Sequence, residues 1–202
     1  MKVTCVKSMW TTTLAAIREE RPCKKGWGIL LESLEKTEAD DEPITLKRIR
    51  ESNGVLDAIW CIRVFKSECH RDAMVQFACD LAELLLPQWR TYAEIQLAEE
   101  LHTLDTALNV VRTGSRPLAV GASLTVFEAR AKAGLTRNGY VPNEELDWAM
   151  DAADAAYTAA CVGKMSCPIS RGAALSKIAD CLQQSDGGLD RRVVEVFTKY
   201  FE

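Results

Sequence analysis

The feature that most constrains the fold is the apolar segment 55–65, which carries only two charged residues, Asp57 and Arg63. Its apolar residues cover nearly every side of a helix, which is typical of a helix in the interior of a domain. Trp60 lies in the middle of the segment, so we expect its side chain in the core. The segment therefore predicts the central helix of a helical domain.

A turn separates this helix from the one before it, in which Leu46 and Ile49 are expected to face the core. The turn is Ser52-Asn53-Gly54, in which asparagine and glycine both tolerate a positive φ. Asp57 follows three residues after Gly54. We expect its carboxylate to accept hydrogen bonds from the free N–H groups at the start of the second helix.

Helical spacing of apolar residues recurs along the whole chain and predicts an all-α fold, a compact bundle of about eight or nine helices. We expect Pro43 to open a helix and Pro87 to interrupt or kink one. No alternating pattern is long enough to build a sheet of substance. The segments with helical spacing are 11–20, 23–36, 43–53, 55–65, 67–86, 89–112, 118–133, a segment after 142, 170–184 and 189–201.

The domain organisation follows from length and composition. The chain has 202 residues, of which 48% are hydrophobic and 27% charged, as in ordinary globular proteins. One helical domain, 1–202, is therefore expected. A division near 113–117 would separate a helical core, 1–113, from an alanine-rich part, 117–202.

Charge and cysteine content limit the environment and the partners. The net charge of −4 argues against binding nucleic acid through bulk charge. No apolar run approaches the roughly 20 residues of a membrane helix, and the N-terminus lacks the pattern of a secretion signal. Several of the eight cysteines lie in apolar helical patterns, so we expect reduced thiols and a cytoplasmic protein.

No motif for catalysis, metal binding or a cofactor is visible. The chain has two histidines, and it has neither a Cys-x-x-Cys nor a paired-histidine motif. Gly26 and Gly28 flank Trp27 within a helical pattern, whereas phosphate-binding loops follow a strand. We therefore predict no catalytic residues, no metal site and no cofactor.

The most charged segment is an acidic loop formed by Glu38, Asp40, Asp41 and Glu42. Such a loop can be a solvated connection, a negative face for a basic partner, or a ligand for a divalent cation. We expect a partner-binding face here.

A basic group follows the acidic loop and consists of Lys47, Arg48 and Arg50. It can pair with the nearby acids, face water, or contribute to a small nucleic-acid patch. Trp148 lies beside an apolar stripe, either in the core or at an interface, where tryptophan is enriched. With the acidic loop, these residues are the predicted partner-binding residues.

Residues 12–90 resemble a helical family of immunity proteins from bacterial polymorphic-toxin systems, with relatives common in phage and prophage genomes. The resemblance is carried by short motifs spread over this segment. They are Cys23, Gly26 and Trp27, Leu34, Lys36 and Thr37, Asp40-Asp41-Glu42-Pro43, Ser52-Asn53-Gly54, Leu56-Asp57-Ala58, Trp60-Cys61, Cys79-Asp80 and Ala82-Glu83.

The resemblance implies an all-helical protein in the cytoplasm of a bacterial host that binds and neutralises one toxin, host or defence protein without turnover; homo-oligomers are compatible with this. One alternative is a nucleic-acid-associated phage accessory protein using Arg48 and Arg50 together with basic residues elsewhere. Another is an enzyme whose site is assembled from distant residues. The residues in question are Arg130, Lys132 and Arg137 for the first, and Asp57, Asp80 and His102 for the second.

Overall fold

The computed structural model describes residues 10–67, 70–96, 109, 174–175, 178 and 189–202. This part is mostly helical, at 72%, and holds six α-helices and one two-stranded sheet. The all-α prediction is therefore correct for its main content, and the small sheet is an addition to it. The helices expected between 97 and 188, and the division near 113–117, lie outside the described residues.

Two three-residue strands form the sheet, where helix starts were expected. β1 (Thr11–Thr13) pairs antiparallel with β2 (Pro43–Thr45), with Thr12 opposite Ile44. The backbone N–H of Leu46 donates to the carbonyl of Trp10 at 3.0 Å and extends the pairing. The expectation that Pro43 opens a helix is therefore wrong. Threonine and isoleucine suit paired strands, and proline is tolerated at the first residue of a strand.

Each strand leads directly into a helix through a threonine cap. α1 (Leu14–Glu19) starts after Thr13, whose hydroxyl accepts the N–H of Ala16 at 3.1 Å. α3 (Leu46–Asn53) starts after Thr45, whose hydroxyl accepts the N–H of Arg48 at 3.1 Å. Each cap satisfies an N–H that has no partner inside the helix. The sheet thus fixes where both helices begin.

The predicted turn between the two central helices is confirmed at Gly54, which has φ +91°. α4 (Val55–Cys61) follows it and continues as the 3-10 turn η1 (Ile62–Val64). Asp57 makes no side-chain cap to α4, so that expectation is wrong. Ile59 is fully buried, but Trp60 is only half-buried, and its predicted core position is corrected below.

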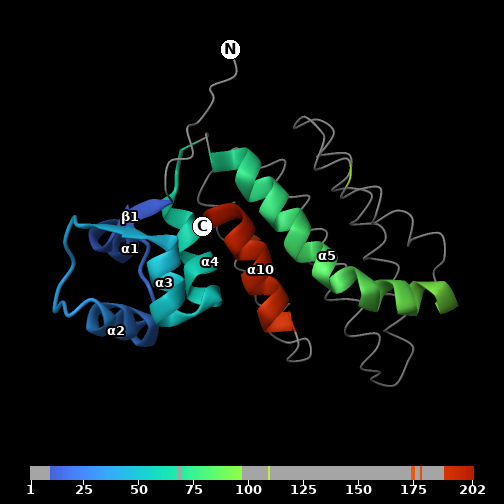
Figure 1. The fold of residues 1–202 in the computed structure, drawn as a ribbon, viewed down its shortest axis with the longest axis horizontal. Helices are drawn as coiled ribbons and strands as arrows, with labels where there is room; N and C mark the ends of the chain where they lie inside the picture. The colour runs from blue at the N-terminus through green and yellow to red at the C-terminus, as the bar shows by residue number, and fades with distance from the viewer. Residues whose placement is uncertain (1–9, 68–69, 97–108, 110–173, 176–177, 179–188) are drawn as a thin grey trace, which may run out of the picture.

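A single long helix replaces the two that were expected on either side of Pro87. α5 (Arg71–Gln96) continues through this proline, and Figure 1 shows a bend along its length. The predicted interruption is therefore wrong, whereas a bend agrees with the predicted kink. This continuity leaves one helix fewer in the described part than the sequence predicted.

The last helix, α10 (Leu189–Phe201), has the bounds that the apolar spacing predicted. It packs against α5 and also contacts α3 and α4 (Figure 1). Phe197 of α10 and Phe77 of α5 are fully buried, with ring centroids 6.2 Å apart. Segments far apart in the chain therefore share one core.

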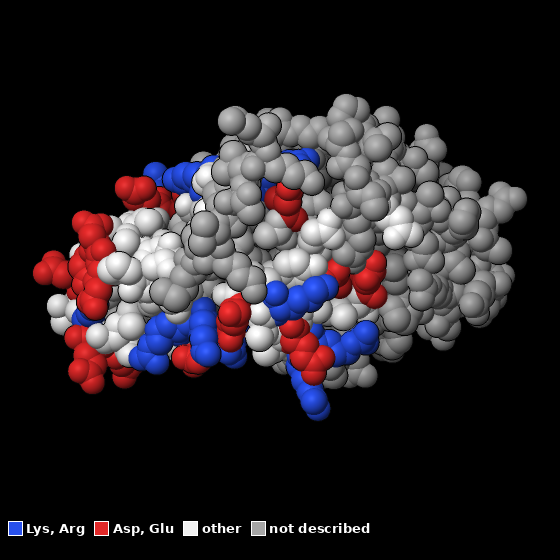
Figure 2. Space-filling model, turned by 45° about the horizontal axis from the view of Figure 1, so that its top comes forward, with Lys and Arg blue, Asp and Glu red and all other residues white. Residues whose placement is uncertain are grey.

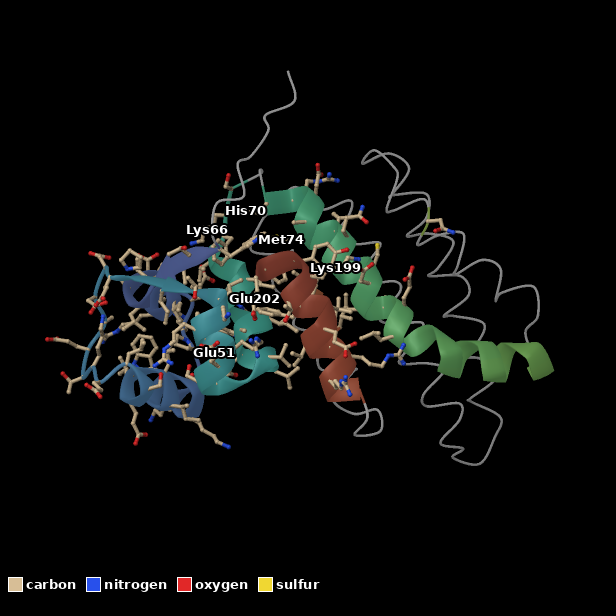
Figure 3. The ribbon with its side chains drawn as sticks, in the orientation of Figure 1. Glu51, Lys66, His70, Met74, Lys199 and Glu202 are labelled. Carbon is tan, nitrogen blue, oxygen red and sulfur yellow. The ribbon has the colours of Figure 1, made fainter. Side chains whose placement is uncertain are left out.

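Polar side chains also join α5 and α10. Asp80 accepts hydrogen bonds from the ammonium of Lys199 at 2.7 Å and from the hydroxyl of Tyr200 at 2.6 Å. Figure 3 shows Lys199 on the side of α10 that faces α5. Burial, followed by the hydrogen bond to Asp80, raises the pKa of Tyr200. The phenol therefore stays protonated and available as a donor.

Aromatic rings pack against one another near the start of α5. Trp10 lies 4.4 Å from the ring of His70, 5.0 Å from Phe65 and 4.7 Å from Phe201, between ring centroids. His70 therefore sits among apolar rings. Its burial lowers its pKa, which outweighs the opposite effect of its hydrogen bond with the backbone of Ser67.

This environment predicts a pH dependence. Because the pKa of His70 is lower in the folded chain than in the unfolded chain, the unfolded chain takes up the proton first as the pH falls. The contribution of neutral His70 is fully present above its unfolded pKa of about 6.5 and decreases as the pH falls through the interval below it. Chemical denaturation at pH 7.5 and pH 5 should show a larger loss of stability for the wild type than for His70→Gln. An equal loss in both proteins would contradict the assignment.

Cys23 is an exposed free thiol, whereas Cys61 is a buried one, as expected from its apolar pattern. None of the helices in the described ranges combines the length and apolarity needed to cross a membrane.

Candidate functional site

The acidic loop lies at one end of the molecule, between α2 (Lys24–Ser33) and β2. Figure 2 shows acidic side chains gathered at this end, at the left of the view. Glu35 has φ +55°, and the N–H of Lys36 donates to the carbonyl of Leu31 at 2.9 Å. This 6→1 hydrogen bond ends α2 and turns the chain into the loop.

Lys36 organises the loop from within. Its ammonium contacts the carboxylates of Asp40 at 2.5 Å and Glu42 at 2.6 Å. The hydrogen bonds to Asp40 and Glu42 raise the pKa of Lys36, and the hydrogen bond from Lys36 lowers the pKa of Asp40. The carbonyl of Asp40 also accepts the N–H of Ala15 at 2.9 Å, which attaches the loop to α1. Asp40 and Glu42 thus hold the loop in shape.

Glu38 and Asp41 are the two remaining carboxylates of the acidic loop. Both side chains are exposed, and neither forms a hydrogen bond or an ion pair with another of the described residues. The loop therefore presents two negative charges that none of the described residues neutralises, on a connection fixed at both ends. The sequence placed all four acids together, but it did not separate the two structural ones from these two.

Within the described residues, the basic group forms no ion pair with the acidic loop. Arg48 donates to the carbonyl of Ser33 at 2.8 Å and so ties α3 to the end of α2. Arg50 binds the side chain of Glu202 at 2.5 Å, and Lys47 lies 4.0 Å from the same carboxylate. Figure 3 places Glu202 at the end of α10, beside α3. These residues therefore connect helices.

Several sequence candidates are not brought together. Trp148, His102 and the basic residues Arg130, Lys132 and Arg137 lie outside the described residues. Asp80 is engaged with Lys199 and Tyr200 between α5 and α10, whereas Asp57 faces α2. In the described part, no group of three or more His, Cys, Asp or Glu side chains is arranged to hold a metal ion.

A cavity of about 130 Å³ lies at the start of α2, where α2 faces α3 and α4, and we call it the α2–α4 cavity. Its walls are mostly apolar, and Cys23 at its rim is exposed, so the cavity reaches the surface. The lining residues are Ile17, Pro22, Cys23, Gly26, Trp27, Leu30, Ile49, Asn53, Asp57, Trp60 and Cys61.

Asp57 is fixed in this cavity by its neighbours. The amide of Asn53 donates to the Asp57 carboxylate at 2.9 Å and to the carbonyl of Gly26 at 2.8 Å. A Cβ atom on Gly26 would lie 2.8 Å from the carboxylate, so only glycine allows this close approach. Cys23 caps α2, with its sulfur accepting the N–H of Gly26 at 3.3 Å. The start of α2 is thereby joined to α3 and α4.

Sequence reasoning missed this cavity as a site. Trp60 was expected in the core, yet it is half-buried in the cavity wall, with the Arg63 guanidinium 4.1 Å from its ring centroid. Cys61 lines the cavity as a neutral thiol, because burial raises its pKa to about 12. One signal was available: short motifs singled out in the sequence supply seven of the lining residues, namely Cys23, Gly26, Trp27, Asn53, Asp57, Trp60 and Cys61.

No family model, curated protein or solved structure matches this chain.

Proposed function

We propose that this chain is a non-enzymatic inhibitor or immunity-type protein of phage or mobile-element origin. It binds a toxin, host or defence protein of the bacterial cytoplasm and neutralises that protein. The observation that carries the proposal is the pair of exposed carboxylates Glu38 and Asp41, which no residue in the described part of the chain neutralises, on a loop held by hydrogen bonds. The resemblance of residues 12–90 to immunity proteins supports the same role.

An ordered acidic face suits a basic partner for two physical reasons. Charges at an interface steer the encounter of two proteins and suppress wrong partners. A loop held in shape before binding loses little conformational entropy on binding. Here Lys36, bridging Asp40 and Glu42, and the bond from Ala15 to Asp40 provide that order. Glu38 and Asp41 then remain available for the partner.

The test is a charge reversal restricted to the two exposed acids. We expect the double variant Glu38→Lys and Asp41→Lys to weaken partner binding about tenfold or more at low salt, mainly through slower association. Asp40 is left intact because its replacement would disturb the loop. The partner is captured from bacterial lysate with the wild type, purified, and titrated against each variant by surface plasmon resonance.

The matched control reverses two exposed acids on other elements, Glu51→Lys on α3 and Glu195→Lys on α10. Its net charge equals that of the test variant, so a loss confined to the test variant assigns the acidic loop. Equal affinity of the wild type and both variants for the partner would show that the acidic loop is not the binding face. The proposal itself fails if no specific protein is captured and the chain shows a turnover activity or binds DNA with a steep salt dependence.

A further inference from the structure

We propose that the α2–α4 cavity binds an alkylated ammonium group, of the kind carried by choline or by a trimethylated lysine side chain. The proposal concerns a ligand site away from the acidic loop and does not depend on it. A cavity of about 130 Å³ is comparable to the roughly 150 Å³ cavities that accept benzene in other proteins. A trimethylammonium head is close to that size.

Two indoles in the cavity wall favour a cation over a neutral group. Trp27 and Trp60 both line the cavity. The face of an indole carries negative electrostatic potential and attracts cations, and quaternary ammonium groups are recognised in this way. Arg63 already holds its guanidinium 4.1 Å from the ring centroid of Trp60. That contact covers one face of Trp60 and leaves Trp27 and the rest of the wall to a ligand.

The counter-charge is Asp57. Its carboxylate lines the cavity and forms no ion pair with any lysine or arginine in the part of the chain that the structure describes. Arg63 lies over the ring of Trp60, and the cationic residues of α2, Lys24 and Lys25, are both exposed, so water screens the charges of these lysines. The half-buried Asp57 is in direct reach of a ligand, and its attraction is screened less.

The hydrogen-bonding groups of the cavity select the type of cation. Asn53 is already used, since its amide N–H groups reach Gly26 and Asp57 and its oxygen accepts the Ser52 hydroxyl at 2.8 Å. A primary ammonium brings three N–H donors that need acceptors, and buried donors without them are costly. An alkylated ammonium has no such donors to satisfy and presents methyl groups to the apolar walls. The lining therefore fits it better than a lysine ammonium.

The test is a titration with choline, followed by the indole N–H signals of Trp27 and Trp60 in ¹H–¹⁵N NMR spectra. We expect saturable shifts of both signals. In the neutral isostere 3,3-dimethyl-1-butanol, carbon replaces nitrogen. The affinity for this alcohol should be lower than that for choline by a factor of about ten or more. A comparison with Nα-acetyl-trimethyllysine amide identifies the source: tighter binding than choline indicates an ammonium on a protein, and weaker binding indicates a free ligand.

Two variants keep the outcome decisive. Asp57→Asn removes the charge and keeps an oxygen for Asn53, and it should weaken choline binding about tenfold. Trp27→Leu removes one indole and should weaken it similarly, while Asp72→Asn, an exposed change on α5, should bind as the wild type does. Circular dichroism checks that each variant is folded. Three outcomes would each overturn the proposal. They are equal binding of choline and the alcohol, unchanged choline affinity in folded Asp57→Asn and Trp27→Leu, and no shift of the indole signals up to about 50 mM choline.

Discussion

Replacing Phe77 with alanine is expected to lower the free energy of unfolding by about 3–5 kcal/mol. Phe77 is fully buried on α5, and its ring meets Phe201 at 4.8 Å and Tyr200 at 5.8 Å between centroids. Truncation removes apolar contact area and leaves a cavity where α10 packs. Because a small domain is stable by only about 5–15 kcal/mol, this change removes a large share of the total.

Urea denaturation followed by circular dichroism measures this loss. The matched control is Asp72→Ala on the same helix; this side chain is 94% exposed and, among the described residues, pairs only with its neighbour Arg71. Exposed pairs of this kind contribute little, so the control should stay within about 1 kcal/mol of the wild type. A Phe77→Ala protein as stable as the control would show that α5 and α10 do not share a core.

The second large effect is expected at Gly54, where alanine should cost about 1–3 kcal/mol. Gly54 has φ +91° and ψ 169°, a combination that is essentially restricted to glycine. A Cβ atom here would meet nothing within 4 Å. The whole cost therefore comes from the backbone, which must leave this conformation and move α3 relative to α4.

Gly28 provides a control of opposite sign. It lies inside α2, has no positive φ, and a Cβ atom on it would also meet nothing within 4 Å. Gly28→Ala should therefore raise the free energy of unfolding by about 0.5–1 kcal/mol, because alanine has the higher helix propensity. Thermal or urea denaturation of both variants measures the pair. A loss of similar size in both would mean that the methyl group, and not the conformation of Gly54, is responsible.

Local signals in the sequence were enough for some of the helical boundaries in the described part. The bounds of α10 follow from its apolar spacing, and the end of α3 follows from the asparagine–glycine pair. The sheet could not be anticipated in this way. Strands of three residues are too short to show alternation, and Thr12 and Ile44 pair across more than thirty residues. The continuity of α5 through Pro87 likewise does not follow from the local pattern, which favours an interruption or a kink at a proline.

The candidate sites show the same limit. Composition alone located the acidic loop. Lys36 binds two of its four acids and leaves the other two exposed, and this division depends on the conformation of the loop, which spacing does not reveal. Arg50 was grouped with the nearby acids, and its partner is Glu202 at the far end of the sequence. Asp57 was expected to cap its own helix, whereas Asn53 and Gly26 position it against α2. The contacts of Arg50 with Glu202 and of Asn53 with Gly26 join residues far apart in the chain, whereas Lys36 acts within its own loop.

The docking of α10 also bears on the time course of folding during synthesis. Its hydrogen bond from Tyr200 to Asp80 spans 120 positions, and that from Arg50 to Glu202 spans 152. Closing loops of this length is slow compared with forming the local contacts of α1 to α4. While a ribosome is still producing α10, the apolar side of α5 around Phe77 lacks its cover. A nascent chain that has not yet reached α10 therefore exposes that surface, and this is the period in which chaperones would engage it.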